Sequence, residues 1–299
     1  MDVKKEENGY RIFTDTNTIH AKYVIMASRY PIINAPGFYF LKMYQQTSYL
    51  IAGEVTEELF SGMYINSEKP TISFRTVKQG NSRLLIAGGL DHKTGTNETI
   101  GDRYKELENI VKKQYLSFKR KYQWSAEDCI SVDKIPYIGE YSSVMPNMYV
   151  ATGYKKWGMT FCYLAAKIIT DKIMKKENEY EEVFTSTRFE PIKNKEEVKN
   201  MLKEVTYSLA IKRLAIPEET LKEVKVGEGK IIEWEGKKVG VYCDERKELH
   251  MIEPICAHLG CELSFNSIEK TWDCPCHGSR YSYDGILIES PSVKDVHKL

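Results

Sequence analysis

Two short segments, CAHLGC at residues 256–261 and CPCHGS at residues 274–279, constrain this chain more than any other feature. Each segment places a cysteine and a histidine close together, and four of the seven cysteines lie in the two segments. The pairs are Cys256 with His258, and Cys274 with His277. Two such loops, facing each other at one end of a small β-domain, would bring four metal ligands to one point.

Three kinds of chemistry compete for this pattern of residues. A zinc site with two cysteines and two histidines matches the ligands, but familiar zinc patterns place both cysteines on one turn and both histidines on a helix. Thioredoxin-like chemistry requires Cys-x-x-Cys, whereas one residue separates Cys274 from Cys276. In a [2Fe–2S] cluster with two imidazoles on one iron and two thiolates on the other, each mixed loop donates one ligand to each iron. The mixed loops favour this cluster over zinc.

The two segments, with fifteen residues between His258 and Cys274, resemble the motif of the Rieske family, C-x-H…C-x-x-H. The resemblance extends from about Val224 to Lys298 and includes Ser290-Pro291, where the family usually has Gly-Pro. It implies a small all-β domain that binds a Rieske [2Fe–2S] cluster. The implied ligands are Cys256 and Cys274 for one iron, and His258 and His277 for the other.

The same resemblance assigns roles to residues beside the ligands. Cys261 and Cys276 occupy the positions that form a disulfide between the loops in the cytochrome-complex branch of the family. Ser279 and Tyr281 match donors that, in that branch, bond a bridging sulfide and a ligand sulfur. Donors to sulfur stabilise the added electron and raise the reduction potential. The outer nitrogens of both histidine ligands are expected near solvent, where electron uptake can couple to imidazole protonation.

The region before residue 190 is expected to form a mixed sheet with helices. Short strand-like runs alternate from Tyr39 to Ile86. Residues 101–122, GDRYKELENIVKKQYLSFKRKY, carry apolar side chains at helical spacing and predict an amphipathic helix. The other expected elements are strands over residues 11–27 and 147–153, a helix over residues 161–175, and a later helix with Val198, Leu202, Val205 and Leu209 on one face.

Three segments of this region are similar to FAD-dependent oxidoreductases of the D-amino-acid-oxidase and glycine-oxidase kind: HAKYVIMASRYP, RLLIAGGLDHKTG and NMYVATGYKKWGMTFCYLAAKIITDKI. In that family the last segment approaches the flavin ring and its ribityl chain. Glycines allow close backbone approach, and a helix N-terminus favours an electronegative group. The matching cofactor-binding positions are Gly153, Gly158, Met159 and Thr160. Residues 40–100 would form the substrate-domain sheet; no catalytic residue is assigned, and His92 and Tyr154 are candidate bases by position only.

One departure from this family is large. The dinucleotide fingerprint G-x-G-x-x-G after an opening strand is absent, and VGEGKII, with Gly227 and Gly229, lies between expected strands. Ser28 and Arg29 stand where the family usually has Thr-Gly. The chain therefore resembles the C-terminal portion of a longer flavoprotein–Rieske fusion, as an engineered fragment, a truncated product or one half of a split protein. FAD is expected to bind only together with the N-terminal region.

The expected fold class is α+β, with a partial FAD-oxidoreductase domain followed by a small all-β Rieske domain. The expected bounds are residues 1–189 for the first domain, 190–217 for a linker helix and 218–299 for the Rieske domain. The chain carries 43 Lys and Arg against 42 Asp and Glu, which gives no electrostatic reason to expect nucleic acid as a partner. No apolar stretch approaches the roughly 20 residues of a membrane span, and no signal peptide is recognisable. These features predict a cytoplasmic protein.

Two classes of function follow. In the first, a substrate reduces a flavin and the cluster carries electrons onward singly. In the second, the chain is an electron-transfer module whose oxidase-like part is only a scaffold or docking surface. In both, the partner is a redox protein or a small-molecule electron acceptor, and an N-terminal FAD-binding half is a further partner of the first. Cys129, Cys162 and Cys243 are expected to be buried as small hydrophobic residues.

Overall fold

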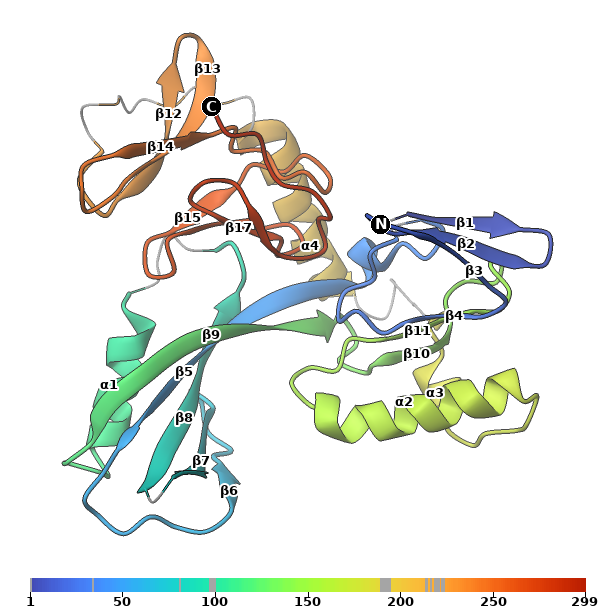
Figure 1. Cartoon of the computed structure of the whole chain (residues 1–299), viewed down its shortest axis with the longest axis horizontal. Coiled ribbons are helices and arrows are strands. Elements are labelled where there is room, and N and C mark those ends of the chain that lie inside the picture. The colour runs from blue at the N-terminus through green and yellow to red at the C-terminus, as the bar shows by residue number, and fades with distance from the viewer. Residues whose placement is uncertain are drawn as a thin grey trace. The chain divides into compact units, whose positions relative to one another are not determined.

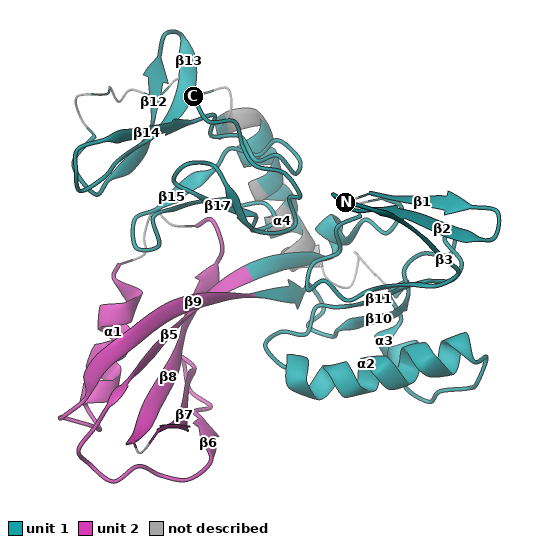
Figure 2. Cartoon of the chain, viewed as in Figure 1, with its two compact units in different colours: residues 1–45, 128–299 teal, residues 46–127 magenta. Residues whose placement is uncertain are grey.

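The computed structural model combines several small β-sheets with a few helices (Figure 1). It describes residues 2–33, 35–80, 82–96, 101–188, 195–212, 215, 217, 221 and 224–299. The chain forms two compact units, residues 1–45 with 128–299 and residues 46–127 (Figure 2). The second unit is therefore an insertion into the first, and the region expected as one domain over residues 1–189 contributes to both.

The unit of residues 46–127 is built on a five-stranded sheet in the order β6-β7-β8-β5-β9. The pairs β6–β7, β7–β8 and β5–β8 are antiparallel. Helix α1 packs against β8 and buries Leu107 and Val111. The strands are β5 Met43–Glu54, β6 Met63–Ile65, β7 Ile72–Gln79, β8 Ser82–Lys93 and β9 Lys119–Ser131.

The helix expected over residues 101–122 was too long, because α1 covers Arg103–Lys112 alone. Asp102 caps its N-terminus by accepting the Lys105 N–H at 3.0 Å. Tyr115 and Phe118 are buried as predicted, but they belong to a turn in which the Phe118 N–H donates to the Tyr115 carbonyl. From residue 119 onward the chain forms strand β9. The last residues of the expected helix, 119–122, therefore pair in the sheet instead.

The unit of residues 1–45 and 128–299 contains two sheets in its N-terminal part. One is antiparallel, in the order β1-β2-β3; the other has the order β10-β11-β4, with β11 and β4 parallel. The second strand expected within residues 11–27 is thus divided between two sheets. The elements are β1 Asp2–Glu6, β2 Gly9–Phe13, β3 Thr18–Ala21, β4 Val24–Met26, η1 Tyr39–Leu41, β10 Tyr137–Glu140, β11 Met148–Thr152, α2 Gly158–Ile173 and α3 Glu181–Phe184.

Helix α2 covers the β10-β11-β4 sheet with one apolar face. Ala165, Ile168 and Ile169 are buried and pack in one cluster with residues of β10 and β11. Because α2 directly follows β11, this packing fixes the direction of the loop that joins them, residues 153–157. The helix therefore begins at Gly158, three residues before the start that the sequence predicts.

The C-terminal part is almost entirely strands, in two small antiparallel sheets. Their orders are β12-β13-β14 and β15-β16-β17-β18. The cysteine-containing segments lie between β14 and β15 and between β16 and β17, and the core beneath them contains Leu263, Trp272 and Tyr281. The strands are β12 Gly229–Trp234, β13 Lys237–Cys243, β14 Leu249–Ile252, β15 Ser264–Asn266, β16 Thr271–Asp273, β17 Arg280–Ser282 and β18 Leu287–Glu289.

The helix that precedes these strands is α4, Lys195–Thr206, continued by a π-helical turn η3, Tyr207–Ile211. Val205 and Leu209 pack against the C-terminal core, as the predicted apolar face requires. Leu202 is exposed instead, and the side chain of Val198 lies outside the described residues, as do residues 189–194 of the predicted linker.

Candidate metal centre and flavin-facing segment

The loops 256–261 and 274–279 repeat one backbone conformation. In the first, the Cys256 N–H donates to the Cys261 carbonyl at 2.8 Å, and the Gly260 N–H donates to the Cys256 carbonyl at 2.9 Å. In the second loop the Cys274 N–H donates to the Ser279 carbonyl at 2.8 Å, and the Gly278 N–H donates to the Cys274 carbonyl at 2.9 Å. The glycines of the two loops have φ of 80° and 82°, a region that favours glycine over other residues. The short sequence repeat thus encodes two matching turns.

These turns bring the four predicted ligands together in like pairs. The thiols of Cys256 and Cys274 are buried and hydrogen-bonded to each other. The imidazole rings of His258 and His277 lie with centroids 5.0 Å apart and planes 89° apart. A cluster with two thiolates on one iron and two imidazoles on the other needs this sorting of ligands. The donor set therefore fits a [2Fe–2S] cluster.

The two thiols titrate as a pair. The hydrogen bond with Cys274 is the largest cause that lowers the pKa of Cys256, to about 6, against burial, which raises it. The same hydrogen bond, followed by burial, raises the pKa of Cys274 well above its usual value. Cys256 is therefore the thiol of the pair that loses its proton first, and iron would displace the proton of Cys274. Burial lowers the pKa of His258 to about 4, so this imidazole is neutral, as ligation requires.

Tyr281 and Ser279 both lie beside Cys256. The Tyr281 hydroxyl accepts the Ala257 N–H at 3.2 Å and lies 3.4 Å from the Cys256 Sγ. Because the backbone N–H occupies a lone pair, the hydroxyl hydrogen is available to the sulfur. The Ser279 Oγ likewise accepts the Ser292 N–H at 2.9 Å and also forms a hydrogen bond with the Cys256 side chain that lowers its pKa. Each hydroxyl is thus oriented as a donor to sulfur.

Cys261 and Cys276 connect the two loops at a point behind the ligands. Their Sγ atoms lie 2.08 Å apart, and their Cα atoms lie 6.6 Å apart. The Cys274 Sγ lies within 4.8 Å of both sulfurs. The pair predicted from the sequence is therefore brought together, one residue from each turn.

The two histidines have unequal exposure, which corrects the expectation that both lie near solvent. His277 is only 1% exposed, whereas His258 is partly exposed and the neighbouring Leu259 is exposed. The difference arises because Phe40 packs its ring against the His277 ring, with centroids 5.9 Å apart, and because Gln45 covers the same loop. The sequence pattern around the ligands contains no sign of this cover.

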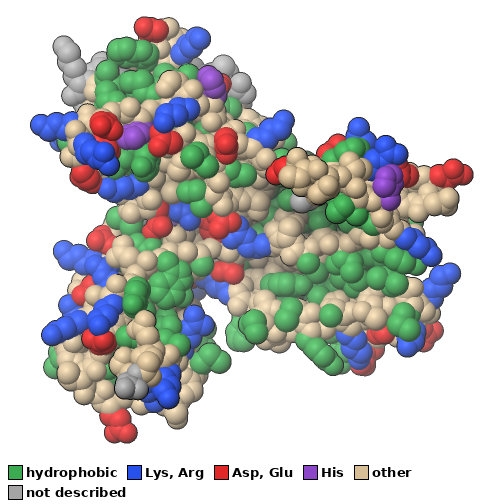
Figure 3. Space-filling model, viewed as in Figure 1, with side chains coloured by type: hydrophobic (Ala, Val, Ile, Leu, Met, Phe, Trp, Pro, Cys, Tyr) green, Lys and Arg blue, Asp and Glu red, His purple; other side chains and the backbone are tan. Residues whose placement is uncertain are grey.

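The predicted flavin-facing residues lie together at the N-terminus of α2. Gly153 follows β11 with φ of 74°, and Gly158 begins the helix. Thr160 is exposed, and Met159 is 91% exposed. Trp157 and Tyr163 are also exposed, and hydrophobic side chains reach the surface of the molecule (Figure 3). The glycine conformation and the helix start can approach a flavin, but the residues that would hold its pyrophosphate are not in the sequence.

The two candidate bases belong to different units. His92 lies on β8 and stacks on the buried Tyr49, with ring centroids 5.8 Å apart. Tyr154 stacks on Phe161 at 6.1 Å, and burial raises the pKa of its hydroxyl to about 12. Both therefore have packing roles. Of the three scattered cysteines, Cys129 and Cys243 are buried as expected, but Cys162 on α2 is exposed.

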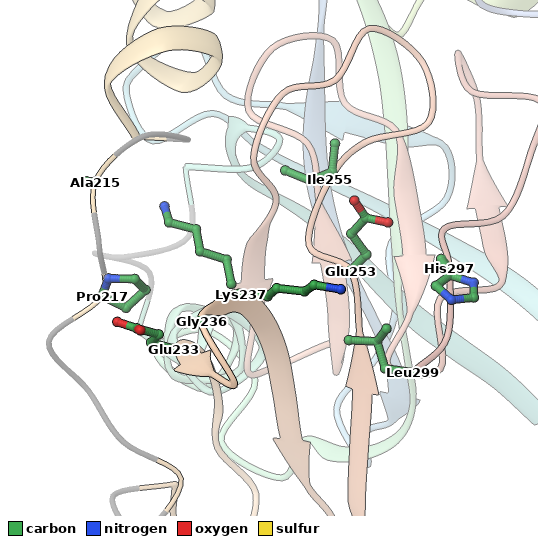
Figure 4. Close-up of a pocket in the computed structure, with 10 residues that line it drawn as sticks. Ala215, Pro217, Glu233, Gly236, Lys237, Glu253, Ile255, His297 and Leu299 are labelled. Atoms are coloured by element: carbon green, nitrogen blue, oxygen red, sulfur yellow. The ribbon is translucent and has the colours of Figure 1, made fainter.

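A cleft of about 610 Å³ lies in the C-terminal part, between β12, β13 and the last residues of the chain (Figure 4). Side chains of both charges line it, among them Glu233, Lys237 and Glu253. None of the predicted ligands or flavin-facing residues contributes to its lining, so this cleft is separate from the candidate metal centre.

Two family models match the chain. A model described as FAD dependent oxidoreductase matches residues 2–172, and a model described as Rieske [2Fe-2S] domain matches residues 215–299. The Rieske domain implies a 2Fe–2S cluster. Among the described residues no helix is long and apolar enough to cross a membrane.

Individual relatives agree with both matches. The Bacillus subtilis (strain 168) protein YhfW, which carries the name of a Rieske 2Fe-2S iron-sulfur protein, is 34% identical over 100% of this chain and 59% of its own length. The cytochrome b6-f complex iron-sulfur subunit 3 of Nostoc sp. is 41% identical over 51 residues, 15% of this chain and 29% of that protein. Glycine oxidase from Geobacillus kaustophilus has a similar fold, with a TM-score of 0.53 and 18% identity over 63% of this chain and 51% of that one. The chain thus spans only part of the length of YhfW and of glycine oxidase.

Proposed function

This chain belongs to the family of FAD-dependent oxidoreductases and contains a Rieske [2Fe–2S] domain, and from that premise we propose that it carries electrons singly within a longer flavin-dependent enzyme. The observation that carries the proposal is the sorting of ligands by two matching turns, with thiol beside thiol and imidazole beside imidazole. Zinc would not require that sorting, because any tetrahedral arrangement of four ligands suffices for it.

The proposed ligands are Cys256 and Cys274 on one iron and His258 and His277 on the other. Bound FAD would supply two-electron oxidation of a substrate and the cluster would supply one-electron transfer, so each substrate would require two passages of an electron through the cluster. The chain's own residues hold the site in place: the glycine turns set the spacing of the ligands, and Tyr281 and Ser279 donate to sulfur. His258 is partly exposed beside Leu259, so an external electron acceptor can reach the site from the side on which this histidine lies.

We assign the Cys261–Cys276 pair as a disulfide that ties the two turns together. Both cysteines are at most 1% exposed, so thiol reductants in solution have little access to them. Such a bond can persist in a reducing compartment when it is shielded in this way.

FAD binding by the complete enzyme would need a second region that supplies the pyrophosphate site. Two features of this chain support such a partner. Strand β4 is at the edge of its sheet, with Ile25 exposed, and the α2 N-terminus carries the exposed Trp157, Met159 and Tyr163. Apolar side chains gathered on one surface mark an interaction site. Gly153, Gly158, Met159 and Thr160 would then face the flavin across that contact.

A second candidate function treats the oxidase-like part as a scaffold for the cluster. His92 and Tyr154 favour it, since each candidate base is engaged in aromatic packing and the two belong to different units. Substrate-dependent reduction of the cluster, measured after the remaining region has been supplied, separates the two functions. Reduction by substrate supports the enzyme, and reduction by a redox protein alone supports the scaffold.

Electron paramagnetic resonance of the dithionite-reduced chain tests the metal assignment. A rhombic signal, with about two irons per chain by elemental analysis, is the expected result. Cys274→Ser should abolish the signal, whereas Cys243→Ser, a buried cysteine outside the site, should leave it intact. A silent spectrum from a chain that contains one zinc would refute the proposal.

A further inference from the structure

The His277 side of the candidate cluster site is covered by residues from the N-terminal part of the same compact unit. That unit joins residues 1–45 with residues 128–299. Gln45, on β5, is 1% exposed. Its side-chain Nε2 lies 3.1 Å from the His277 carbonyl, 3.2 Å from the Gly278 carbonyl and 2.6 Å from the Ser290 carbonyl. One amide therefore holds the cluster loop and the Ser290 loop together.

The aliphatic stem of Gln45 is pressed against the same loop. A Cβ added at Gly278 would lie 2.6 Å from the Gln45 Cβ, closer than real side chains approach. Gly278 also has φ of 82°, so the turn and the contact both require glycine. The loop that carries His277 is thus packed directly on the oxidoreductase part, with no room for a side chain between them.

Further contacts from residues 29–45 reach the same side of the site. The Phe40 ring meets the His277 ring edge-on, with planes 86° apart. Arg29 forms an ion pair with Glu289, and its backbone has φ of 60°.

The loop of His258 is more exposed than the loop of His277. Ala257 and Leu259 are exposed, and His258 is partly exposed. The contacts of Gln45, Phe40 and Arg29 just described reach residues 277–290. The two imidazoles therefore have different surroundings, although the turns that carry them are alike.

We propose that Gln45 is a positioning residue of the cluster site, which fastens the His277 loop to the oxidoreductase domain. His277 is then the ligand that faces inward, and His258 is the ligand that faces outward. This inference rests on the proposed function for the presence of the cluster, and it adds to that site a residue from outside the Rieske domain. A buried amide that bonds backbone carbonyls fixes the loop, and through the loop the orientation of the ligand.

The test uses the full chain purified with its cluster. Gln45→Met keeps the length of the side chain and removes both N–H donors. Gln46→Met is the matched control, because the next residue of a strand points to the opposite face. In hydrogen–deuterium exchange, peptides from residues 274–290 should exchange about tenfold faster in Gln45→Met, since one net hydrogen bond accounts for roughly that factor. Peptides from residues 256–261 should be unchanged, and Gln46→Met should match the parent chain.

A spectroscopic readout separates positioning from general stability. The paramagnetic resonance signal of the reduced cluster should shift or broaden in Gln45→Met and keep its form in Gln46→Met. Phe40→Leu provides a second variant if Gln45→Met does not fold, and it should change the signal in the same way. Equal exchange and equal spectra in the parent chain and these variants would overturn the inference. A parent chain without any cluster signal would instead refute the proposed function, and the exchange comparison would still decide whether Gln45 fastens the loop.

Discussion

At the residue scale, the hydroxyl of Tyr281 offers the clearest link between a single atom and the reduction potential. It accepts the Ala257 N–H and lies 3.4 Å from the Cys256 Sγ, so its hydrogen is directed to a ligand sulfur. The reduced cluster carries more negative charge than the oxidised one, and a donor therefore stabilises it more. Loss of the donor should lower the reduction potential.

Tyr281→Phe tests this directly. A hydrogen bond to a charged group contributes about 1.5–3 kcal/mol. For a one-electron couple, a tenfold change in the equilibrium constant corresponds to about 59 mV. The free energy of this hydrogen bond therefore corresponds to a fall in the reduction potential of at most roughly 65–130 mV. A redox titration followed by visible absorption measures the change. Tyr283→Phe, two residues along and packed on Tyr242 instead, should leave the potential unchanged. Equal potentials in the parent chain and in Tyr281→Phe would remove the donor role.

A substitution at Gly153 tests whether the loop between β11 and α2 depends on the backbone conformation that glycine allows. Its φ is 74°, while a Cβ there would meet no atom closer than 3.4 Å. Gly153→Ala should therefore destabilise the chain through the backbone alone, by about 1–2 kcal/mol. Gly158→Ala is the control, because Gly158 begins α2 and its Cβ would touch only Tyr154 at 3.7 Å. Urea denaturation should show a lower midpoint for the first variant only, and a lower midpoint for both would contradict this account.

Single residues also show what the sequence could not reveal. The candidate ligands could be named from the motif and its resemblance, because each turn of six residues carries both a cysteine and a histidine. Gln45 belongs to no motif, since its role depends on packing between segments more than two hundred residues apart. The conformation of Arg29 was partly indicated by the sequence, because this residue stands where the related family usually has glycine. Its φ of 60° shows that the backbone keeps a conformation that favours glycine.

At the scale of elements, local patterns were reliable where one periodicity dominates. The helix α2 and the all-β character of the C-terminal part were predicted, because one period of apolar residues dominates in each. Residues 119–122 were misassigned to a helix, since the run KRKYQ is compatible with either period and pairing in the sheet decided the outcome. The insertion of residues 46–127 as a separate unit depends on long-range pairing, which no local pattern contains.

The two turns of the metal centre should depend on the bridge between Cys261 and Cys276. The bridge closes a loop with a sequence separation of 15 residues, and a loop of that size contributes about 3 kcal/mol in the chain-entropy account. In the Cys261→Ser, Cys276→Ser double variant, the cluster should be lost faster on warming, as measured by the decay of its visible absorption. Cys243→Ser, at a buried cysteine outside the two turns, controls for loss of a thiol. Equal decay in the double variant and the parent chain would show that the turns hold the cluster without the bridge.

At the scale of the whole molecule, the chain combines an oxidoreductase part whose sequence lacks the G-x-G-x-x-G fingerprint with a candidate metal centre that contains all four proposed ligands. The first matches a flavoenzyme family over residues 2–172, and all four proposed ligands of the second lie within residues 256–277. Cluster binding should therefore not depend on flavin. FAD binding, in contrast, should depend on a region that this sequence does not contain, because glycine turns without a dinucleotide fingerprint offer too few contacts to the diphosphate.

The purified chain should accordingly show the absorption of the cluster and little flavin. Supplying the part of YhfW that this chain does not span should restore stoichiometric FAD, measured by flavin release on denaturation. Met159→Lys places a charge on the apolar surface at the start of α2 and should reduce that recovery, since the charge would have to be buried against the added region. Met174→Lys, at an exposed methionine on the opposite end of the helix, should not. Stoichiometric FAD in the chain alone would contradict the need for a second region. Equal recovery in the two lysine variants would place the contact elsewhere than the α2 N-terminus.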